Sequence, residues 1–313
     1  MKLLSGKKIM ATAAMGLVLL FGADTVNIVH AGSSQEGTAV EQNVQVQQAR
    51  SANIDWTKGA DSDITVIGIG LPPENMGSRG LPLARRAAVL DAYRYLAETI
   101  KGVQVDADSI MAEHVVKSDT VKSNVSALIQ GARILEEGSN PDGSYYVKMT
   151  VPLFGVSNSV AAIAIPEISQ PGSPEPLPEV NIKTTSLPKQ ELKEVRSAGY
   201  TGVIVDASGL GLDATFSPVI YDENGRAIYG IKNINPDLAI SKGMVEYSTS
   251  KEQAAVNSRA GSNPLILRAV AVKGGRNSAN KVNVVVTVDD GDKILLANEK
   301  SGMLQSCAVV FVK

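Results

Sequence analysis

LARRAAVLDAYRYLAETIK, residues 83–101, carries the strongest helical pattern in this chain of 313 residues. Apolar side chains such as Ala84, Ala88 and Leu96 recur in it at spacings of three or four residues, with charged side chains between them. This period predicts an amphipathic α-helix with one face in a core. Gly102 follows directly, and glycine commonly occupies the position after a helix end, so we expect the helix to stop there.

Strand and helix patterns flank this segment. Residues 64–70, ITVIGIG, show strand-type alternation before it, and residues 103–106 form a shorter alternating segment after it. A second, more polar helix is expected to begin at Ser109 or Glu113 and to end at Gln130. The chain therefore alternates strand and helix up to this point.

A hairpin is expected to complete the first domain. Residues 132–137 and 145–152 have strand patterns, and the segment Asn140-Pro141-Asp142-Gly143 between them has turn-forming residues at every position. The order β-α-β-α-β-β predicts a small α+β domain over residues 54–160, with its helices on one face of a sheet. Residues 32–53 lack a clear period and are interpreted as a polar lead-in.

Proline separates the two halves of the chain. Residues 161–196 contain six prolines among serine, glycine and glutamate, which favours a semi-stiff, extended linker. A short helix, residues 189–196, is expected at the end of this linker.

The remaining residues, 197–313, are rich in strand patterns. Asn224-Gly225, between two apolar runs, is the best hairpin signal of the chain, and Asp289-Asp290-Gly291-Asp292 is expected as a turn between two strands. The expected strands are 201–206, 215–221, 226–230, 265–272, 282–288, 294–297 and 307–312, with an interrupted helical stretch at 236–259. The fold class is therefore α+β: two small domains, each a mixed or antiparallel sheet with helices packed on one face, joined by a Pro-rich linker.

The first 31 residues have the pattern of a secretory signal peptide. Lys2, Lys7 and Lys8 form a positive segment, and residues 9–21 are a short apolar run. Val29-His30-Ala31 is then a small-x-small cleavage site, which predicts export with cleavage after Ala31. A retained N-terminal anchor is the alternative. Cleavage would leave no transmembrane span in a periplasmic or secreted protein.

Charge and cysteine content restrict the possible partners. The formal net charge of −2 gives no indication of nucleic-acid binding. Cys307 is the single cysteine, so an intramolecular disulfide is impossible. With no cysteine near the predicted cleavage site, we expect no lipid anchor and a soluble or peripherally bound envelope protein.

Catalytic and cofactor patterns are missing from the sequence. His114 is the single histidine beyond the predicted signal peptide, and no Gly-x-Ser-x-Gly motif accompanies it. One cysteine and one histidine cannot supply four zinc ligands, and no Gly-Lys-Ser/Thr phosphate loop occurs. We therefore expect no catalytic residues, no cofactor and no metal.

One candidate interaction surface is basic. Arg85, Arg86 and Arg94 lie beside the apolar face of the helix predicted at 83–101. They are candidates for contact with an acidic partner or an anionic envelope polymer. A solvated surface with salt bridges is the alternative interpretation.

Weaker candidates lie in loops of the second domain. Asp206 and Asp213 flank Gly209-Leu210-Gly211, and Asp289 and Asp292 belong to the expected turn. These carboxylates could line a ligand pocket, and the second pair could hold calcium weakly, although the spacing of a calcium-binding loop is missing. Solvated turns are the alternative.

Residues 54–155 resemble the LPP20-type envelope proteins and are similar to the N-terminal module of the flagellar assembly protein FlgT. The resemblance rests on Asp55-Trp56-Thr57-Lys58-Gly59, on Gly68-Ile69-Gly70, on the helix at 83–101 with Val103-Gln104-Val105 after it, and on residues 146–152. It implies a non-catalytic protein of the cell envelope, linked to flagellar or outer-membrane assembly. The namesake family is lipid-anchored, whereas this chain lacks the required cysteine.

The sequence thus predicts an exported, non-catalytic adaptor of the cell envelope, with an envelope protein as partner. A periplasmic module that binds a small ligand or polysaccharide through loops of the second domain is the alternative. A hydrolase is the least favoured, because no pair of nucleophile and base is visible.

Overall fold

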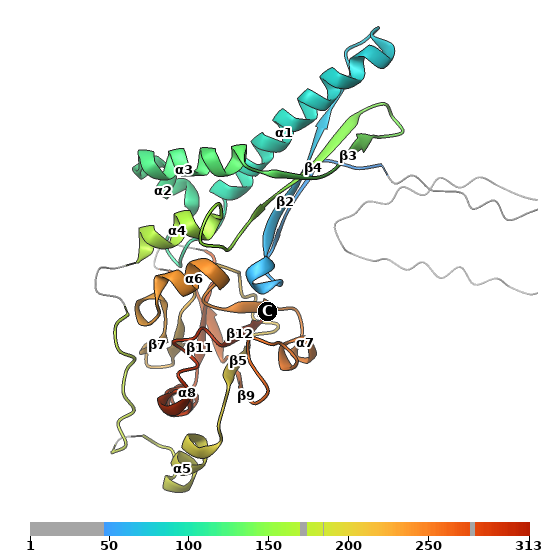
Figure 1. Cartoon of the computed structure of the whole chain (residues 1–313). Coiled ribbons are helices and arrows are strands. Elements are labelled where there is room, and N and C mark those ends of the chain that lie inside the picture. The colour runs from blue at the N-terminus through green and yellow to red at the C-terminus, as the bar shows by residue number, and fades with distance from the viewer. Residues whose placement is uncertain (1–46, 170–173, 184, 276–278) are drawn as a thin grey trace, which may run out of the picture. The chain divides into compact units, whose positions relative to one another are not determined.

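The computed structural model describes residues 47–169, 174–183, 185–275 and 279–313. From Gln47 onward these residues form one compact unit. They contain two small α+β domains, which confirms the predicted fold class (Figure 1). The predicted signal peptide, residues 1–31, and most of the predicted lead-in lie outside the described residues.

The N-terminal domain is built on an antiparallel sheet with strand order β1-β2-β4-β3. Its strands are β1 (Ser51–Asp55), β2 (Asp63–Gly70), β3 (Arg133–Ser139) and β4 (Tyr145–Pro152). The predicted strand at 64–70 and the predicted hairpin are confirmed. β1 begins within the segment 32–53, which was expected to be a polar lead-in. The strand was missed because it is a largely exposed edge strand with little apolar alternation.

Helix α1 (Leu81–Lys101) runs along β2 on one face of this sheet (Figure 1). A methyl group placed on Gly68 would lie 2.3 Å from the backbone nitrogen of Ala92, and one on Gly70 would lie 2.0 Å from the carbonyl oxygen of Ala84. Glycine on the strand and alanine on the helix therefore bring the two backbones into direct contact. The buried stripe of α1 consists of Ala84, Ala88, Ala92, Leu96 and Ile100.

The second predicted helix is two helices, α2 (Met111–Lys117) and α3 (Asp119–Gln130). Ser118 separates them with an extended backbone, and its hydroxyl accepts a hydrogen bond from the N–H of Val121, which caps α3. The strand expected at 103–106 is reduced to an isolated bridge between Gln104 and Ile110.

Helix α4 (Val160–Ile168) follows the sheet, in a segment expected to begin the linker. The Ser159 hydroxyl caps it by accepting the N–H of Ala162. Pro166 lies in its last turns, so the proline that suggested a linker is inside a helix. The domain boundary at residue 160 itself stays a prediction.

The C-terminal domain contains two four-stranded sheets. One is entirely parallel, in the order β8-β12-β5-β9, and corrects the expectation of a mixed or antiparallel sheet. The other is mixed, in the order β10-β11-β6-β7, and contains the predicted Asn-Gly hairpin. The strands are β5 (Gly202–Asp206), β6 (Ile220–Asp222), β7 (Ala227–Tyr229), β8 (Glu246–Ser248), β9 (Pro264–Arg268), β10 (Ala271–Lys273), β11 (Asn283–Val286) and β12 (Val309–Val312).

In the described part of this half there are four α-helices and one 3-10 helix: α5 (Lys189–Ser197), η3 (Ile231–Asn233), α6 (Pro236–Lys242), α7 (Lys251–Ala255) and α8 (Val288–Ser301). The predicted helix at 189–196 is confirmed by α5. The turn expected at 289–292 and the strand expected at 294–297 are wrong, because both lie in α8. The Thr287 hydroxyl accepts the N–H of Asp290 at 3.1 Å, and acidic residues occupy the first turn, as helix N-termini favour.

Aromatic side chains from both domains pack into one cluster. Trp56 meets Phe216 with ring centroids 5.0 Å apart, and Phe154 meets Phe216 at 5.6 Å. Tyr247 lies against Trp56 and also against Phe311. The one tryptophan of the chain is therefore a core residue, 8% exposed, rather than part of a surface patch.

Candidate functional site

The three arginines predicted as an interaction surface all lie on α1. Arg85 pairs with Glu137 of β3 at 2.9 Å, and Arg94 pairs with Asp91 at 2.9 Å. Among the described residues Arg86 has no hydrogen bond or ion pair, so it is the arginine of the three whose charge is not already matched. The pKa of the Arg85 guanidinium is raised by its hydrogen bond to Glu137.

Exposed leucines flank Arg86 along α1. Leu83 is 41% exposed and Leu90 68% exposed, and their separation of seven residues places them on the same side of α1. Leu71 and Met76, also exposed, lie in the loop that leads into the helix. We refer to Leu71, Met76, Leu83, Arg86 and Leu90 as the α1 surface. The sequence indicated Arg86, its one charged member, and its leucines were missed because exposure cannot be deduced from apolar spacing alone.

Asp206 and Asp213 have different surroundings. Asp206 is 3% exposed and accepts bonds from Lys251 at 2.7 Å, from Arg268 at 2.8 Å and from the N–H of Ser208 at 3.0 Å. Burial favours a higher pKa for Asp206, but the hydrogen bonds from Lys251 and Ser208 outweigh it and lower the pKa to about 2. Asp206 therefore holds α7 and β9 to the end of β5.

Asp213 is exposed and accepts the backbone N–H of Lys281 at 3.0 Å. Among the described residues no hydrogen bond or ion pair joins it to Asp206, although the two flank Gly209-Leu210-Gly211 in sequence.

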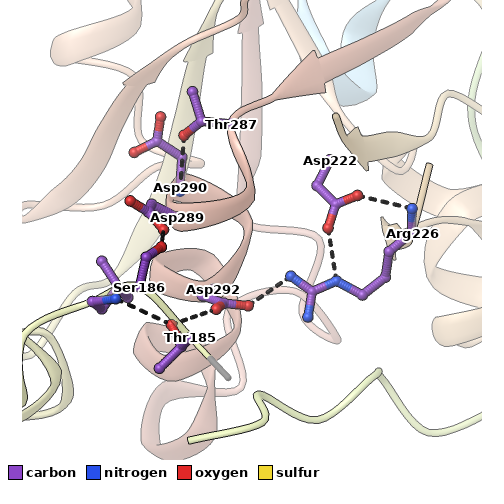
Figure 2. A network of polar contacts seen from close by, with 9 residues as sticks. Thr185, Ser186, Asp222, Arg226, Thr287, Asp289, Asp290 and Asp292 are labelled. Atoms are coloured by element: carbon purple, nitrogen blue, oxygen red, sulfur yellow. Dashed lines mark hydrogen bonds and ion pairs between the residues drawn. The ribbon is translucent and has the colours of Figure 1, made fainter. Parts of the chain in front are cut away.

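Asp289 and Asp292 belong to a polar network at the beginning of α8 (Figure 2). Asp292 accepts a hydrogen bond from Arg226 at 2.6 Å and one from the Thr185 hydroxyl at 2.7 Å. Arg226 also binds Asp222 at 2.8 Å, and Asp289 accepts from the Ser186 hydroxyl. A cavity of about 370 Å³ adjoins this network, but both predicted ligand residues already bind groups of the protein itself.

The remaining polar candidates give no chemical site. In the parts of the chain that the structure describes, no group of three or more His, Cys, Asp or Glu could hold a metal ion. His114 contacts the Ser109 hydroxyl at 3.1 Å. Cys307 is buried, and burial raises the pKa of its thiol. A buried thiol with a raised pKa is a poor nucleophile.

A second cavity, of about 470 Å³, lies where β2 begins and β4 ends. Thr150 is central to its polar side: its hydroxyl lies 3.2 Å from a carboxylate oxygen of Asp63, and its strand register places it opposite Arg133. The sequence did not single out these residues, because each occurs in a segment whose pattern indicated only a strand. The cavity is lined by Ala60, Asp61, Ser62, Asp63, Leu128, Gly131, Arg133, Thr150, Val151, Pro152, Phe154, Ser157 and Asn158.

No described helix of this protein is both long enough and apolar enough to cross a membrane. A comparison with curated proteins finds no match. The family model of the LPP20 lipoprotein matches residues 55–151, which confirms the predicted LPP20-type resemblance; the similarity to FlgT is not confirmed. The match also weighs against the expected lack of a lipid anchor, since the family is named for a lipoprotein.

The second half of the chain is matched separately. Residues 202–313 match the family model of the second domain of Tp0624 from Treponema pallidum, a similarity that the sequence analysis did not anticipate. Each model covers less than half of the chain. The N-terminal domain is thus similar to the LPP20 lipoproteins, which points to the cell envelope, and the C-terminal domain is similar to the second domain of Tp0624.

Proposed function

We propose that this chain is an exported, non-catalytic adaptor of the cell envelope that binds a protein partner through the α1 surface. The observation that carries the proposal is the pair of exposed leucines, Leu83 and Leu90, that lie along α1 on either side of Arg86, an arginine without an ion-pair partner among the described residues. Single exposed leucines are common on soluble proteins, whereas a contiguous apolar group beside a free charge is typical of interaction sites.

The position of this surface on α1 supports the proposal. Ala88 and Ala92 are fully buried against the sheet, and Leu83 and Leu90 lie on the opposite side of the helix. The core of the domain therefore does not need these leucines. Covering them with a partner would remove apolar surface from water, at roughly 25 cal/mol per Å².

A non-catalytic role is supported by the surroundings of the candidate nucleophile and base. Cys307 is buried, and within the described residues the His114 ring has its one polar contact with the Ser109 hydroxyl. The LPP20 family model is not that of a known enzyme family. Binding of a ligand through the C-terminal loops has less support, because Asp206 and Asp292 already bind cationic groups of the protein.

In-cell crosslinking in the native host, followed by envelope fractionation and mass spectrometry, tests the proposal. The full chain is compared with the double variant Leu83→Glu/Leu90→Glu and with Val116→Glu, which places one glutamate on an exposed valine of α2. We expect the wild type and Val116→Glu to capture the same envelope component, and the double variant to lose it.

The captured component also distinguishes two settings. Basal-body proteins would assign the adaptor to flagellar assembly, and outer-membrane proteins would assign it to outer-membrane assembly. Undiminished capture by the double variant, or a wild type that captures nothing, would contradict the proposal.

A further inference from the structure

We infer that the 470 Å³ cavity of the N-terminal domain binds a zwitterionic ligand of the amino-acid class, with its ammonium group at Asp61 and Asp63 and its carboxylate at Arg133. This site lies apart from the α1 surface and from every site predicted by sequence. Its volume falls within the range of 300–1,000 Å³ that is typical of small-molecule sites.

Opposite charges lie at two sides of this cavity. Asp63 and Arg133 lie on the same face of the sheet on either side of Thr150, and all three line the cavity. No ion pair joins Asp63 to Arg133, whose guanidinium has no partner among the described residues. Two opposite charges held apart across a cavity match a ligand that carries both signs.

Each end of the cavity has charged groups that are free to bind a ligand. Asp63 has a distant ion pair with Lys58 at 3.8 Å, but Lys58 is closer to Asp55, at 3.1 Å. The Asp61 side chain has no hydrogen bond or ion pair within the described ranges and is exposed. The acidic end therefore offers carboxylate oxygens to an ammonium group. Arginine binds carboxylates through two parallel hydrogen bonds, which suits the opposite end.

The wall of the cavity also contains a buried hydroxyl without a hydrogen-bond partner, that of Ser62. Ser62 is fully buried and lines the cavity, and its hydroxyl is the one buried side-chain nitrogen or oxygen of the described residues that makes no hydrogen bond. Leaving such a group unpaired costs about 1–3 kcal/mol, so native structures rarely do so without a reason. Because Ser62 is 0% exposed, a ligand reaches its hydroxyl only when the wall of the cavity shifts, and the ligand would then supply the missing hydrogen bond.

The backbone of Asn158 is the third observation. Asn158 adopts φ 53°, a left-handed conformation in which asparagine is enriched over most other non-glycine residues. It lines both this cavity and a smaller one of about 190 Å³ between α3 and α4. The apolar lining residues Leu128 and Phe154 then favour a ligand with an apolar side chain.

Isothermal titration calorimetry on the full chain tests this inference. The probes are L-leucine and the dipeptide Leu-Leu, with leucine amide, which lacks the carboxylate, and N-acetyl-leucine, which lacks the ammonium group. We expect both zwitterions to bind at least tenfold more tightly than either blocked compound. If leucine binds more tightly than Leu-Leu, the natural ligand is a free amino acid. If Leu-Leu binds more tightly, the natural ligand is a short peptide.

Charge-removing variants assign each end of the ligand. Arg133→Gln should abolish the preference for leucine over leucine amide, and Asp63→Asn should abolish the preference for leucine over N-acetyl-leucine. Arg79→Gln, an exposed arginine outside the cavity, is the matched control and should change neither preference. Thermal unfolding confirms that each variant is folded.

Two results would overturn the inference: the absence of measurable binding by either zwitterion at millimolar concentration, or a preference that survives Arg133→Gln in a folded protein. Because crosslinking of the α1 surface does not depend on these residues, failure here leaves the adaptor proposal standing.

Discussion

Trp56 and Phe216 meet edge to face with their ring centroids 5.0 Å apart, although 160 residues separate them in the chain. The contact joins the N-terminal domain to the C-terminal domain inside the described compact unit. Because Trp56 is the one tryptophan of the protein, its fluorescence reports directly on this contact.

We expect Phe216→Ala to lower the free energy of unfolding by about 3–5 kcal/mol, because it removes a fully buried ring and leaves a cavity. Urea denaturation followed by Trp56 fluorescence measures the change, and the folded-state emission should also shift. Leu90→Ala, at an exposed position, is the control and should change stability by less than about 0.5 kcal/mol. Equal losses in the two variants would contradict the expectation.

The glycine of β2 gives a second prediction. Gly68→Ala would place a methyl group 2.3 Å from the backbone of α1, so helix and strand must separate. We expect a loss of about 1–3 kcal/mol, as for overpacked cores. Gly102→Ala adds the same methyl group where its nearest neighbour lies at 3.5 Å, and should be nearly neutral in the same denaturation assay. If Gly68→Ala leaves the free energy of unfolding unchanged, α1 and β2 can accommodate the methyl group without loss of packing.

Asp206 predicts how stability depends on pH. Its pKa of about 2 in the folded protein is below the ordinary 3.8, so the carboxylate stabilises the fold above about pH 4. This stabilisation, about 2 kcal/mol, is lost as the pH falls through the folded-state pKa. Asp206→Asn should therefore flatten the stability profile between pH 4 and pH 2, measured by thermal unfolding. An unchanged slope in the variant would assign the acid sensitivity to other carboxylates.

Thr287 gives a prediction for α8. Thr287→Ala removes the hydroxyl that accepts the N–H of Asp290, and we expect a loss of about 1 kcal/mol. Thr287→Ser keeps the hydroxyl and should retain most of the stability in the same unfolding measurement. If Thr287→Ser and Thr287→Ala lower the stability equally, the methyl group of Thr287 contributes to stability and the capping hydroxyl does not.

Helix α1 and the β3–β4 hairpin were predictable because local patterns determine them. The period of alanines in α1 and the Asn-Pro-Asp-Gly turn before β4 each specify one structure without help from distant residues. The same holds for the Asn224-Gly225 hairpin. In these elements the local preference and the tertiary structure agree.

Helix α8 was missed because two signals conflicted. Asp290-Gly291 is a common turn pair, and Leu295 and Leu296 in an apolar run also suit a strand. The cap at Thr287 with Asp290 three residues later was the signal for a helix. Gly291 is not a turn residue here: a methyl group on it would lie 3.1 Å from Ile228 of β7, so it allows α8 to pack closely.

The candidate sites were less predictable than the fold. Arg85, Arg86 and Arg94 have the same residue type in one helix. Arg94 pairs with Asp91 three residues earlier in that helix, whereas only the tertiary contact with Glu137 of β3 distinguishes Arg85 from Arg86. Likewise, the cavity next to Thr150 forms from segments between residues 60 and 158, and no local pattern brings these together.

The backbone contact between α1 and β2 has a consequence for recognition. With glycine at residues 68 and 70 against alanine at 84 and 92, the helix cannot roll about its long axis without a collision. Leu83 and Leu90 are therefore presented at a fixed angle before any partner arrives. The backbone that carries these leucines is already ordered, so a partner would have to order only their side-chain rotamers, and the strand beneath the helix helps to set the orientation in which the partner attaches.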